Sequence, residues 1–353
     1  MKNNLLIITS SLGAGGLEKM VTKVANYYSK KDWKVTICCL MSREKEIFYH
    51  LNKNISVEFF EYRNSKRKPI ISWLRYLRKI SEKCDASIVL SMTLKIAALC
   101  ALSIKHKNKR FVMREISDPK SKVRSRLLDS ILFLIIHKID ALIMQTKWEA
   151  SCYPKNLQKK CEIIPNPCNV EQIQWNQNSK TFFTMGRLYN IQKRHDILIE
   201  SFSIFANKHP DYKLIIYGDG PDYDFDIKLI KKLKLETNIQ IHKPTPKVIN
   251  LIKNNYLFVM TSDFEGMSNA LLECYLMGIP CLSTDWPGVT DIISHETDGI
   301  IAKRNDIQEI SKCFEMMISD KDKCLRLSQN AKKRWVDFEE NSILDLYAKV
   351  IEG

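Results

Sequence analysis

Two carboxylates eight positions apart, Glu265 and Glu273, stand out in this chain as groups suited to ligand chemistry. They lie in residues 262–273, which read Ser-Asp-Phe-Glu-Gly-Met-Ser-Asn-Ala-Leu-Leu-Glu. Carboxylates accept hydrogen bonds from hydroxyl groups, and the free N–H groups at the start of a helix attract anions. The segment therefore indicates a site for a phosphorylated or polyhydroxylated ligand.

The elements around these carboxylates follow from the same stretch. Residues 257–262 form an apolar run typical of a buried strand, Gly266 permits a tight turn, and residues 269–277 are rich in helix formers. Gly278 then ends the helix. We expect the helix N-terminus to face the carboxyl end of the strand. The alternative is an ordinary amphipathic helix whose Glu273 is solvated.

A second loop carries several cations and reads Met-Gly-Arg-Leu-Tyr-Asn-Ile-Gln-Lys-Arg-His, residues 185–195. A fixed guanidinium and an ammonium can stabilise the negative charge that builds on a departing diphosphate, without a metal ion. Arg187 and Lys193 are the candidates for this catalytic role. A solvated loop is the alternative for Lys193, and Arg194 and His195 are expected at the surface or at a helix cap.

A glycine-rich turn opens the first predicted helix, in residues 10–19, Ser-Ser-Leu-Gly-Ala-Gly-Gly-Leu-Glu-Lys. Glycines there let the backbone approach a ligand closely, or simply permit tight helix packing. A dinucleotide-binding enzyme would carry an acid at the end of the second strand, but residues 38–41 read Cys-Cys-Leu-Met. The turn alone is therefore a weak signal. Asp219, in Gly-Asp-Gly-Pro, is expected to serve turn geometry.

These motifs resemble the retaining glycosyltransferases of family 4, particularly the bacterial surface-polysaccharide members. The resemblance is carried by the E-x7-E pattern and by the longer run EGMSNALLECYLMGIPCLSTDWPG, residues 265–288. It implies that Glu273 holds the nucleotide ribose and that Glu265 contacts the donor sugar. The backbone amides that would line the sugar and the diphosphate are those of Gly266, Met267, Ser268 and Asn269.

The resemblance also implies roles for two other loops. Gly15 and Gly16 would face the donor diphosphate and the acceptor, while Arg187 and Lys193 would hold the donor phosphates. Retention in this family implies front-face attack by the acceptor hydroxyl, with the donor phosphate taking its proton. No protein base or metal cofactor is then expected, in keeping with a sequence that shows neither a Ser/His/Asp arrangement nor a suitable D-x-D motif.

The acceptor side is predicted from residues 113–119, Met-Arg-Glu-Ile-Ser-Asp-Pro, which resemble the family's E-x-x-D-P loop. Arg114 and Glu115 are candidates to meet the donor sugar or the acceptor, although a strand-ending turn explains the Asp-Pro pair equally well. Residues 140–149 are interpreted as core and residues 164–167 as an interdomain turn. The family often has a glycine near the nucleobase where this chain has Ile-His-Lys-Pro-Thr, so the base stays open.

Short apolar runs alternate with longer helical patterns along the whole chain, which is typical of parallel α/β sheets. The first series of predicted strands covers residues 5–9, 34–40, 57–60, 87–90, 110–113, 141–145 and 162–164. The second series covers residues 181–185, 212–217, 238–241, 257–260, 280–283 and 299–301.

The polar stretch of residues 171–180 separates the two series and places a domain boundary near residue 170. We expect an α/β chain of two doubly wound Rossmann-like domains, whose ligand sites lie at the carboxyl ends of the sheets. This matches the GT-B fold that the resemblance implies, with the two domains facing each other. The expected domains are an acceptor-binding domain (1–170), a nucleotide-sugar-binding domain (171–340) and a helix (341–353) that crosses back to the first.

Composition is consistent with a two-domain enzyme of the cytoplasm. The chain has 353 residues, 45% of them hydrophobic, which supplies two cores. The eleven cysteines form no C-x-x-C pair, so we expect buried free thiols and no structural zinc site. Asn3 and Asn4 lead straight into a strand, so no signal peptide is expected.

The formal net charge of +15 indicates an anionic partner or surface. The apolar residues 131–136 are too few to span a bilayer but suit an amphipathic or buried helix. A solvated charged face is the alternative to membrane contact. The basic residues concentrate at Arg63, Lys66, Arg67, Lys68, Arg75, Arg78 and Lys79, and again at Lys105, Lys107, Lys109, Arg110, Arg114, Lys120, Lys122, Arg124 and Arg126.

The sequence therefore predicts a retaining glycosyltransferase at the inner face of the cytoplasmic membrane. It would move a hexose or N-acetylhexosamine from a nucleotide sugar, expected to be a UDP-sugar, to a lipid-linked oligosaccharide for a surface polysaccharide such as O-antigen or capsule. A sugar-nucleotide epimerase of the same shape would need acid/base side chains that are not identified. A nucleic-acid-binding protein would need aromatic residues among the basic runs, where Trp73 and Tyr76 are sparse, so nucleic acid is not the expected partner.

Overall fold

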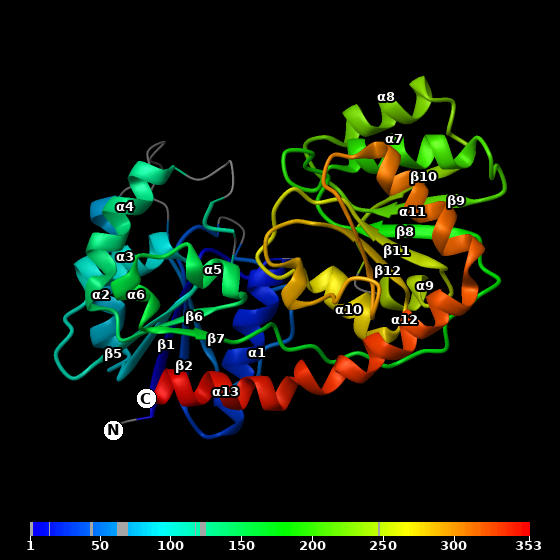
Figure 1. Ribbon diagram of the computed structural model, residues 1–353. Helices are drawn as coiled ribbons and strands as arrows, with labels where there is room; N and C mark the ends of the chain where they lie inside the picture. Colours follow the sequence, from blue (N-terminus) through cyan, green and yellow to red (C-terminus); the bar gives the residue numbers. More distant parts are fainter. Residues whose placement is uncertain are drawn as a thin grey trace. The chain divides into compact units, whose positions relative to one another are not determined.

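The computed structural model describes residues 3–13, 15–42, 45–61, 70–116, 118–120, 125–245 and 248–353. The chain divides into two compact units (Figure 1). Two separate segments of the chain form the first unit, and one continuous segment forms the second. Unit 1 comprises Met1–Pro167 together with Glu340–Gly353, and unit 2 comprises Cys168–Glu339. The sequence-based boundaries, near residues 170 and 340, fall close to these divisions.

Unit 1 contains a parallel sheet with the order β3-β2-β1-β4-β5-β6-β7. Its strands are β1 (Asn4–Thr9), β2 (Lys34–Cys39), β3 (Ser56–Phe59), β4 (Ile88–Ser91), β5 (Arg110–Arg114), β6 (Ala141–Met144) and β7 (Cys161–Ile163). Both faces of β1 are buried because the strand is apolar at successive positions. Leu6 and Ile8 join one hydrophobic cluster, and Leu5 and Ile7 join another.

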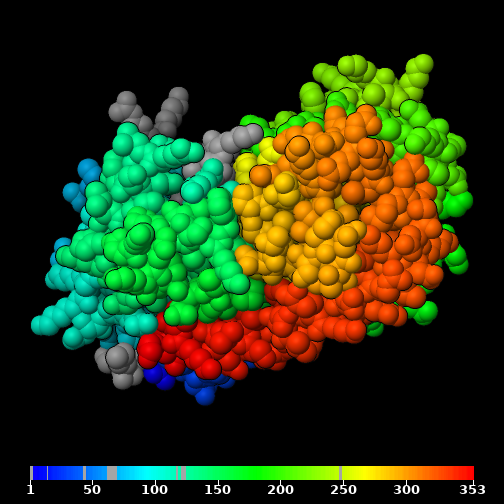
Figure 2. Space-filling view, in the orientation of Figure 1, coloured from blue at the N-terminus to red at the C-terminus, as the bar shows by residue number. Residues whose placement is uncertain are grey.

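Helices cover both faces of this sheet. They are α1 (Gly16–Lys30), α2 (Ile70–Lys83), α3 (Leu94–Ser103), α4 (Arg126–Ile135), α5 (Lys147–Ser151), α6 (Lys155–Gln158), the 3-10 turn η1 (Ile136–Lys138) and the C-terminal α13 (Glu340–Glu352). Helices α2 and α3 contribute to the cluster that contains Leu6, whereas α1 and α13 contribute to the cluster that contains Leu5. In Figure 2 the red α13 lies at the surface of unit 1.

Unit 2 repeats this plan with a parallel sheet of order β10-β9-β8-β11-β12-β13. Its strands are β8 (Thr181–Met185), β9 (Lys213–Tyr217), β10 (Ile239–His242), β11 (Leu257–Met260), β12 (Cys281–Thr284) and β13 (Ile300–Ala302). Its helices are α7 (His195–Ala206), α8 (Tyr223–Lys232), α9 (Val248–Ile252), α10 (Asn269–Met277), α11 (Ile307–Ser319) and α12 (Lys321–Lys333), with 3-10 turns η2 (Val289–Asp291) and η3 (Arg334–Asp337). Phe182 and Phe183 on β8 point into separate clusters on the two faces.

The structure confirms the α/β architecture predicted from the sequence. Each predicted strand is present, and its ends lie within one residue of the prediction. All eleven cysteines are free, and eight of them are buried. In the described part of the chain, no helix is long and apolar enough to cross a membrane.

The two basic runs are less uniform than the sequence indicates. Arg114 is buried, with 1% of its surface exposed, so it adds nothing to a charged surface. The basic residues that lie outside the described residues are Arg63, Lys66, Arg67, Lys68, Lys122 and Arg124.

Candidate functional site

The strand order of unit 2 reverses direction between β8 and β11. The chain runs from β8 through β9 to β10 on one side of the sheet and then returns to β11 on the other side of β8. Ligands of doubly wound sheets bind at such a reversal, beyond the carboxyl ends of the strands. Residues 186–194 follow β8, and residues 261–268 follow β11. Both charged loops predicted from the sequence therefore lie at one switch point.

The loop that carries Arg187 is fixed by the neighbouring turn after β9. A Cβ atom on Gly218 would lie 2.2 Å from the carbonyl oxygen of Gly186, and one on Gly220 would lie 2.3 Å from that of Leu188. The Leu188 N–H donates to the Asp219 carbonyl over 3.0 Å. The glycines on either side of Asp219 thus permit a close backbone approach, and this confirms a turn role for the segment.

Arg187 itself projects from this fixed backbone and is exposed. Its guanidinium carbon lies 5.6 Å from the centre of the Tyr189 ring. Among the described residues it forms no ion pair, so its charge is not neutralised by an acid of the fold. A guanidinium held in this way is available to an anionic ligand.

Lys193 and Glu265 form the ion pair that joins the two loops. The Lys193 Nζ donates to Glu265 Oε1 over 2.6 Å, and the side chains are only 16% and 8% exposed. Ser262 Oγ donates to the same carboxylate oxygen over 2.7 Å, and Gln192 Nε2 donates to Oε2 over 3.3 Å. Three donors from two loops therefore hold the Glu265 carboxylate in one orientation. The interpretation of Lys193 as a solvated lysine is wrong.

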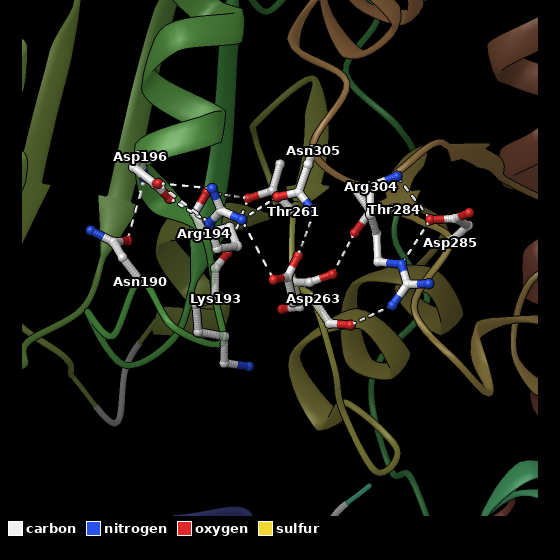
Figure 3. Close-up of polar contacts among 11 residues, drawn as sticks. Asn190, Lys193, Arg194, Asp196, Thr261, Asp263, Thr284, Asp285, Arg304 and Asn305 are labelled. Atoms are coloured by element: carbon white, nitrogen blue, oxygen red, sulfur yellow. Dashed lines mark hydrogen bonds and ion pairs between the residues drawn. The ribbon is translucent and has the colours of Figure 1, made fainter. Parts of the chain in front are cut away.

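Arg194, the next residue, connects the same loops through Asp263 (Figure 3). Its backbone is left-handed, with φ of 53°, an uncommon conformation for a residue with a Cβ. The guanidinium pairs with Asp196 over 3.0 Å and with Asp263 over 3.4 Å, and it also contacts the Asn305 side-chain oxygen. Asn305 in turn donates to Asp263 over 3.0 Å. Arg194 precedes α7 at its cap position, as predicted, but its side chain is committed to this network.

The network continues to the loops after β12 and β13. Arg304 Nη1 donates to the Asp263 carbonyl over 2.8 Å, and Arg304 Nε pairs with Asp285 over 3.0 Å (Figure 3). The Thr284 hydroxyl donates to the Ser262 carbonyl over 2.7 Å. The segment that carries Glu265 is therefore braced on two sides by polar contacts.

His195 is buried at the start of α7, next to the cap residue, so of its two expected positions the surface one is wrong. Only 2% of its surface is exposed, because it forms the first residue of α7 beneath the loop. Burial, assisted by the nearby charge of Lys193, lowers the pKa of the imidazole to about 3. The ring is therefore neutral near pH 7 and adds no positive charge to the site.

Helix α10 begins and ends as the sequence predicts. Ser268 precedes it and accepts a hydrogen bond from the Leu271 N–H over 3.4 Å, and Gly278 ends it with φ of 89°. The turn residues Gly266 and Met267 are buried together with Ser268, whereas Asn269 and Glu273 are half-buried. The first turn of α10 therefore lies directly after the Glu265 loop, with Glu273 one turn farther along the helix.

The glycine turn of unit 1 lies at the corresponding reversal between β1 and β4. Gly15 precedes α1 with an extended backbone, and Gly16 is the first residue of the helix. Glu18 reaches back over this turn and accepts a hydrogen bond from the Ser11 hydroxyl over 2.7 Å. A Cβ atom on Gly15 would lie 2.3 Å from the Glu18 carboxylate, so the absence of a side chain makes room for this contact.

Arg114 and Glu115 are buried at the end of β5, each with 1% exposure. Arg114 Nε donates to the Tyr347 hydroxyl of α13 over 2.7 Å, and its Nη2 donates to the Asn166 side-chain oxygen. Glu115 accepts a hydrogen bond from the Tyr153 hydroxyl over 2.6 Å. Their contact with a sugar or acceptor stays a prediction, and the structure gives both residues a packing role.

A second buried acid, Glu149, lies near this pair. Its Oε2 accepts a hydrogen bond from the Gln145 N–H over 2.6 Å. Burial, together with the negative charge of Glu115, raises the pKa of Glu149 to about 8. In the described parts of the chain no group of three or more His, Cys, Asp or Glu residues is arranged to hold a metal ion.

Several residues of the two sites carry no sequence signal that points to these contacts. Asp263 lies two positions before Glu265, but its partners Arg194 and Asn305 are distant in sequence. Asn166, in the predicted interdomain turn, accepts hydrogen bonds from both Arg114 and Gln145. Neither connection follows from spacing.

The fold and the switch-point site together define a class, the two-domain α/β proteins whose ligands bind at the carboxyl ends of parallel strands. The family described as glycosyl transferases group 1 matches residues 167–334, and that described as glycosyltransferase family 4 matches residues 14–172. The two matches together span most of both units. This chain therefore belongs to the group 1 and family 4 glycosyltransferases.

Curated relatives match over nearly the full length. An uncharacterized glycosyltransferase of Haemophilus influenzae is 21% identical over 99% of this chain and 100% of its own. A Campylobacter jejuni enzyme is 25% identical over 96% of each chain. That enzyme is an N-acetylgalactosamine-N,N'-diacetylbacillosaminyl-diphospho-undecaprenol 4-alpha-N-acetylgalactosaminyltransferase. An amylovoran biosynthesis glycosyltransferase of Erwinia amylovora is 22% identical over 98% of this chain and 99% of its own.

Solved structures share the fold at low identity. TarM of S. aureus, in complex with UDP and other ligands, gives a TM-score of 0.84 at 13% identity and covers 100% of both chains. HepE of Anabaena, in complex with UDP and glucose, gives a TM-score of 0.83 at 15% identity and covers 99% of both chains. The predicted GT-B fold class is confirmed.

Proposed function

We propose that this glycosyltransferase moves a hexose or N-acetylhexosamine from a UDP-sugar to a lipid-linked oligosaccharide, with retention at the anomeric carbon. The observation that carries the proposal is the Lys193–Glu265 pair, held over 2.6 Å at the switch point of unit 2, where the loop that carries Lys193 also carries the exposed Arg187. A buried carboxylate paired with a lysine, on a site whose loop also supplies an exposed arginine, suits a ligand that joins hydroxyl groups to a diphosphate.

Each group of the site has a part in the proposed reaction. The carboxylate of Glu265 accepts a hydrogen bond from a hydroxyl of the donor sugar, and that of Glu273 accepts hydrogen bonds from the ribose. The backbone amides of residues 266–269 and the positive end of α10 face the diphosphate. Arg187 and Lys193 stabilise the charge that grows on the departing diphosphate, so the proposed reaction needs no metal cofactor.

The proposed chemistry is a front-face displacement. The bond between the acceptor oxygen and the anomeric carbon forms as the bond from that carbon to the diphosphate oxygen breaks, on the same face of the sugar. The departing phosphate oxygen takes the acceptor proton. Gly15 and Gly16, in unit 1, lie at the reversal where backbone can approach the donor diphosphate or the acceptor.

The acceptor proposal is supported by the relatives. The Campylobacter enzyme is named for a sugar carried on diphospho-undecaprenol, and the Erwinia relative for amylovoran biosynthesis. The proposed location is accordingly the inner face of the cytoplasmic membrane, where an anionic surface would attract a chain of net charge +15. Nucleic acid is not a partner in this proposal.

Thermal denaturation in the presence of nucleotides tests the donor assignment. A ligand that binds only the native state at 100 times its Kd stabilises by about 2.7 kcal/mol, so UDP and one UDP-sugar should raise the Tm whereas GDP and ADP should not. Glu273→Ala should abolish the shift because it removes the proposed ribose contact. The matched control is Glu236→Ala, which removes an exposed glutamate elsewhere in unit 2.

Three outcomes would count against parts of the proposal. Stabilisation by GDP or ADP alone would overturn the choice of base, and an unchanged UDP shift in Glu273→Ala would remove that residue from the site. Failure of every nucleotide would contradict the donor site itself. Retention is checked by NMR, as the anomeric configuration of the product formed on a soluble acceptor analogue.

A further inference from the structure

Helix α4 turns a row of large apolar side chains toward solvent. Leu127, Leu128, Ile131 and Leu134 are 76%, 41%, 49% and 75% exposed. Positions 127, 131 and 134 are spaced by four and three residues, so their side chains lie along one side of the helix. We call these four residues the α4 stripe. Single exposed leucines are common, but a contiguous row marks an interaction surface.

The opposite side of α4 already packs against the core of unit 1. Leu132, Phe133 and Ile135 are half-buried against the cluster of α2, α3 and β5, and the Phe133 ring lies 4.8 Å from that of Tyr153. The fully buried residue of the helix is an acid, Asp129. A helix that is apolar on both sides is normally covered on both sides. The outer apolar side of α4 therefore needs a further partner.

Exposed cations surround this apolar row. Arg126 opens α4 and Lys138 closes the turn that follows it. Helix α3 packs against α4, and α2 packs against α3, so the three helices form one layer (Figure 1). Further exposed cations in this layer and in the residues just after α3 are Arg75, Lys79, Lys95, Lys105 and Lys107. None of these seven forms an ion pair with an acid among the described residues.

We propose that the α4 stripe inserts into the headgroup region of an anionic lipid bilayer, with α4 lying parallel to the membrane. The helix has ten residues, too few to span a bilayer but enough to lie at its surface. Lysine and arginine reach lipid phosphates while their stems stay on apolar surface, and each near an anionic leaflet adds to binding. This inference rests on the proposed lipid-linked acceptor for its choice of partner.

The charge pattern favours lipid over the other partners that an apolar row could take. Lysine is depleted at the core of protein interfaces, whereas here cations border the apolar row at both ends. A second copy of this chain would bring the same cations against each other, which opposes a symmetric contact. An anionic lipid surface, by contrast, is attracted by the cations at the two ends of α4 and by those on α2, on α3 and just after α3.

Vesicle co-sedimentation tests the proposal with the full chain and the double variant Leu127→Glu/Leu134→Glu. The wild type should bind vesicles that contain phosphatidylglycerol, bind phosphatidylcholine vesicles weakly, and lose affinity as salt is added. The variant should bind the anionic vesicles at least about tenfold more weakly, because two glutamates replace inserted leucines. The matched control is Val336→Glu/Leu346→Glu, which adds the same charge at two exposed apolar positions outside α4 and should bind like the wild type.

The UDP-induced shift in Tm is measured on the same proteins. It tells a loss of vesicle binding apart from a loss of folding or of UDP binding. We expect the same shift in all three proteins. Equal vesicle binding by wild type and stripe variant, or no binding by the wild type, would overturn the inference even if UDP binds. A wild-type dimer in sedimentation equilibrium that the stripe variant converts to monomer, without vesicle binding, would assign the stripe to a second copy instead. Vesicle binding by a wild type whose Tm does not change with any nucleotide would refute the proposed donor but support the docking surface.

Discussion

The two units share the same order over six strands, to which unit 1 adds β7, but they place charged side chains differently. In unit 2 the reversal between β8 and β11 carries Lys193 and Glu265, which remain partly accessible at 16% and 8%. In unit 1 the reversal between β1 and β4 carries the glycine turn at Gly15, and the charged residues Arg114 and Glu115 lie at β5, one strand farther away. Those two side chains are 1% exposed.

A charged residue at the end of a strand is therefore not in itself evidence of a catalytic or ligand-binding role. Arg114 is occupied by Tyr347 and Asn166, so an incoming ligand finds no donor there. Arg187, by contrast, is held on a fixed backbone with its guanidinium exposed. Paired charges that are fully buried support packing, whereas charges that remain more exposed, such as Lys193 and Arg187, can exchange partners with a substrate.

The largest effect on activity is expected from Arg187→Ala. The variant should lose about 100- to 1000-fold in kcat/KM, the scale observed when one preorganised donor to a developing anion is removed. Its Tm should stay close to that of the wild type because the side chain is exposed. Steady-state kinetics and thermal denaturation measure the two effects. Arg326→Ala, at another exposed arginine of unit 2, serves as the control. Wild-type turnover in Arg187→Ala would show that the exposed guanidinium takes no part in the reaction.

Arg114→Met should show the opposite pattern. It keeps much of the side-chain volume but leaves the buried Tyr347 hydroxyl and the Asn166 side chain short of a donor, and this should lower the free energy of unfolding by about 2–4 kcal/mol. Urea denaturation measures the loss, with Arg78→Met on the exposed face of α2 as the control. UDP affinity should not change. A stable Arg114→Met protein with at least tenfold weaker donor binding would instead place Arg114 in the site.

Glu149→Gln is expected to change how the free energy of unfolding depends on pH. The pKa of Glu149 is raised from 4.5 to about 8, so the folded state holds its proton more tightly than the unfolded state does. The stabilisation from this group is full below pH 4.5 and is lost as the pH rises to about 8. Glu149→Gln removes this loss, so the stability of the variant relative to the wild type should rise between pH 5 and pH 8.

Urea denaturation at the two pH values measures this change. Glu162→Gln, at an exposed position on β7, is the control and should show no pH-dependent gain. A stability difference between wild type and Glu149→Gln that does not vary with pH would show that Glu149 is ionised in the folded protein.

Much of the fold follows from the sequence because the strands are apolar on both faces and stand between clear turn residues. β8 and β11 coincide with their predicted bounds, and α10 begins and ends at the predicted residues because Ser268 and Gly278 supply its caps. The surface alternative for His195 was wrong, since the residue lies buried at the start of α7, next to the cap residue. Its polar ring suggests the surface, but it begins a helix that packs on the core of unit 2, and the gain from burial outweighs the cost of keeping the ring neutral.

The site is predictable to the extent that it lies in continuous motifs. Lys193 and Glu265 meet because their loops follow neighbouring strands, which strand prediction and the switch-point rule together indicate. The bracing by Arg194, Asp263 and Asn305 is not predictable, since it depends on loops from three separate strands and on left-handed backbone at two of these residues. Likewise, no spacing relates Arg114 to Tyr347 in the last helix.

The return of the chain to unit 1 has a consequence for synthesis on the ribosome. Unit 2 is one uninterrupted segment, whereas the core of unit 1 includes Leu344, Tyr347 and Ile351 from the final helix. Domains generally fold as units in the order of their synthesis. Here the second unit can complete its core first, and the first must wait, with the α13-facing side of β4, β5 and β6 uncovered, until α13 has emerged.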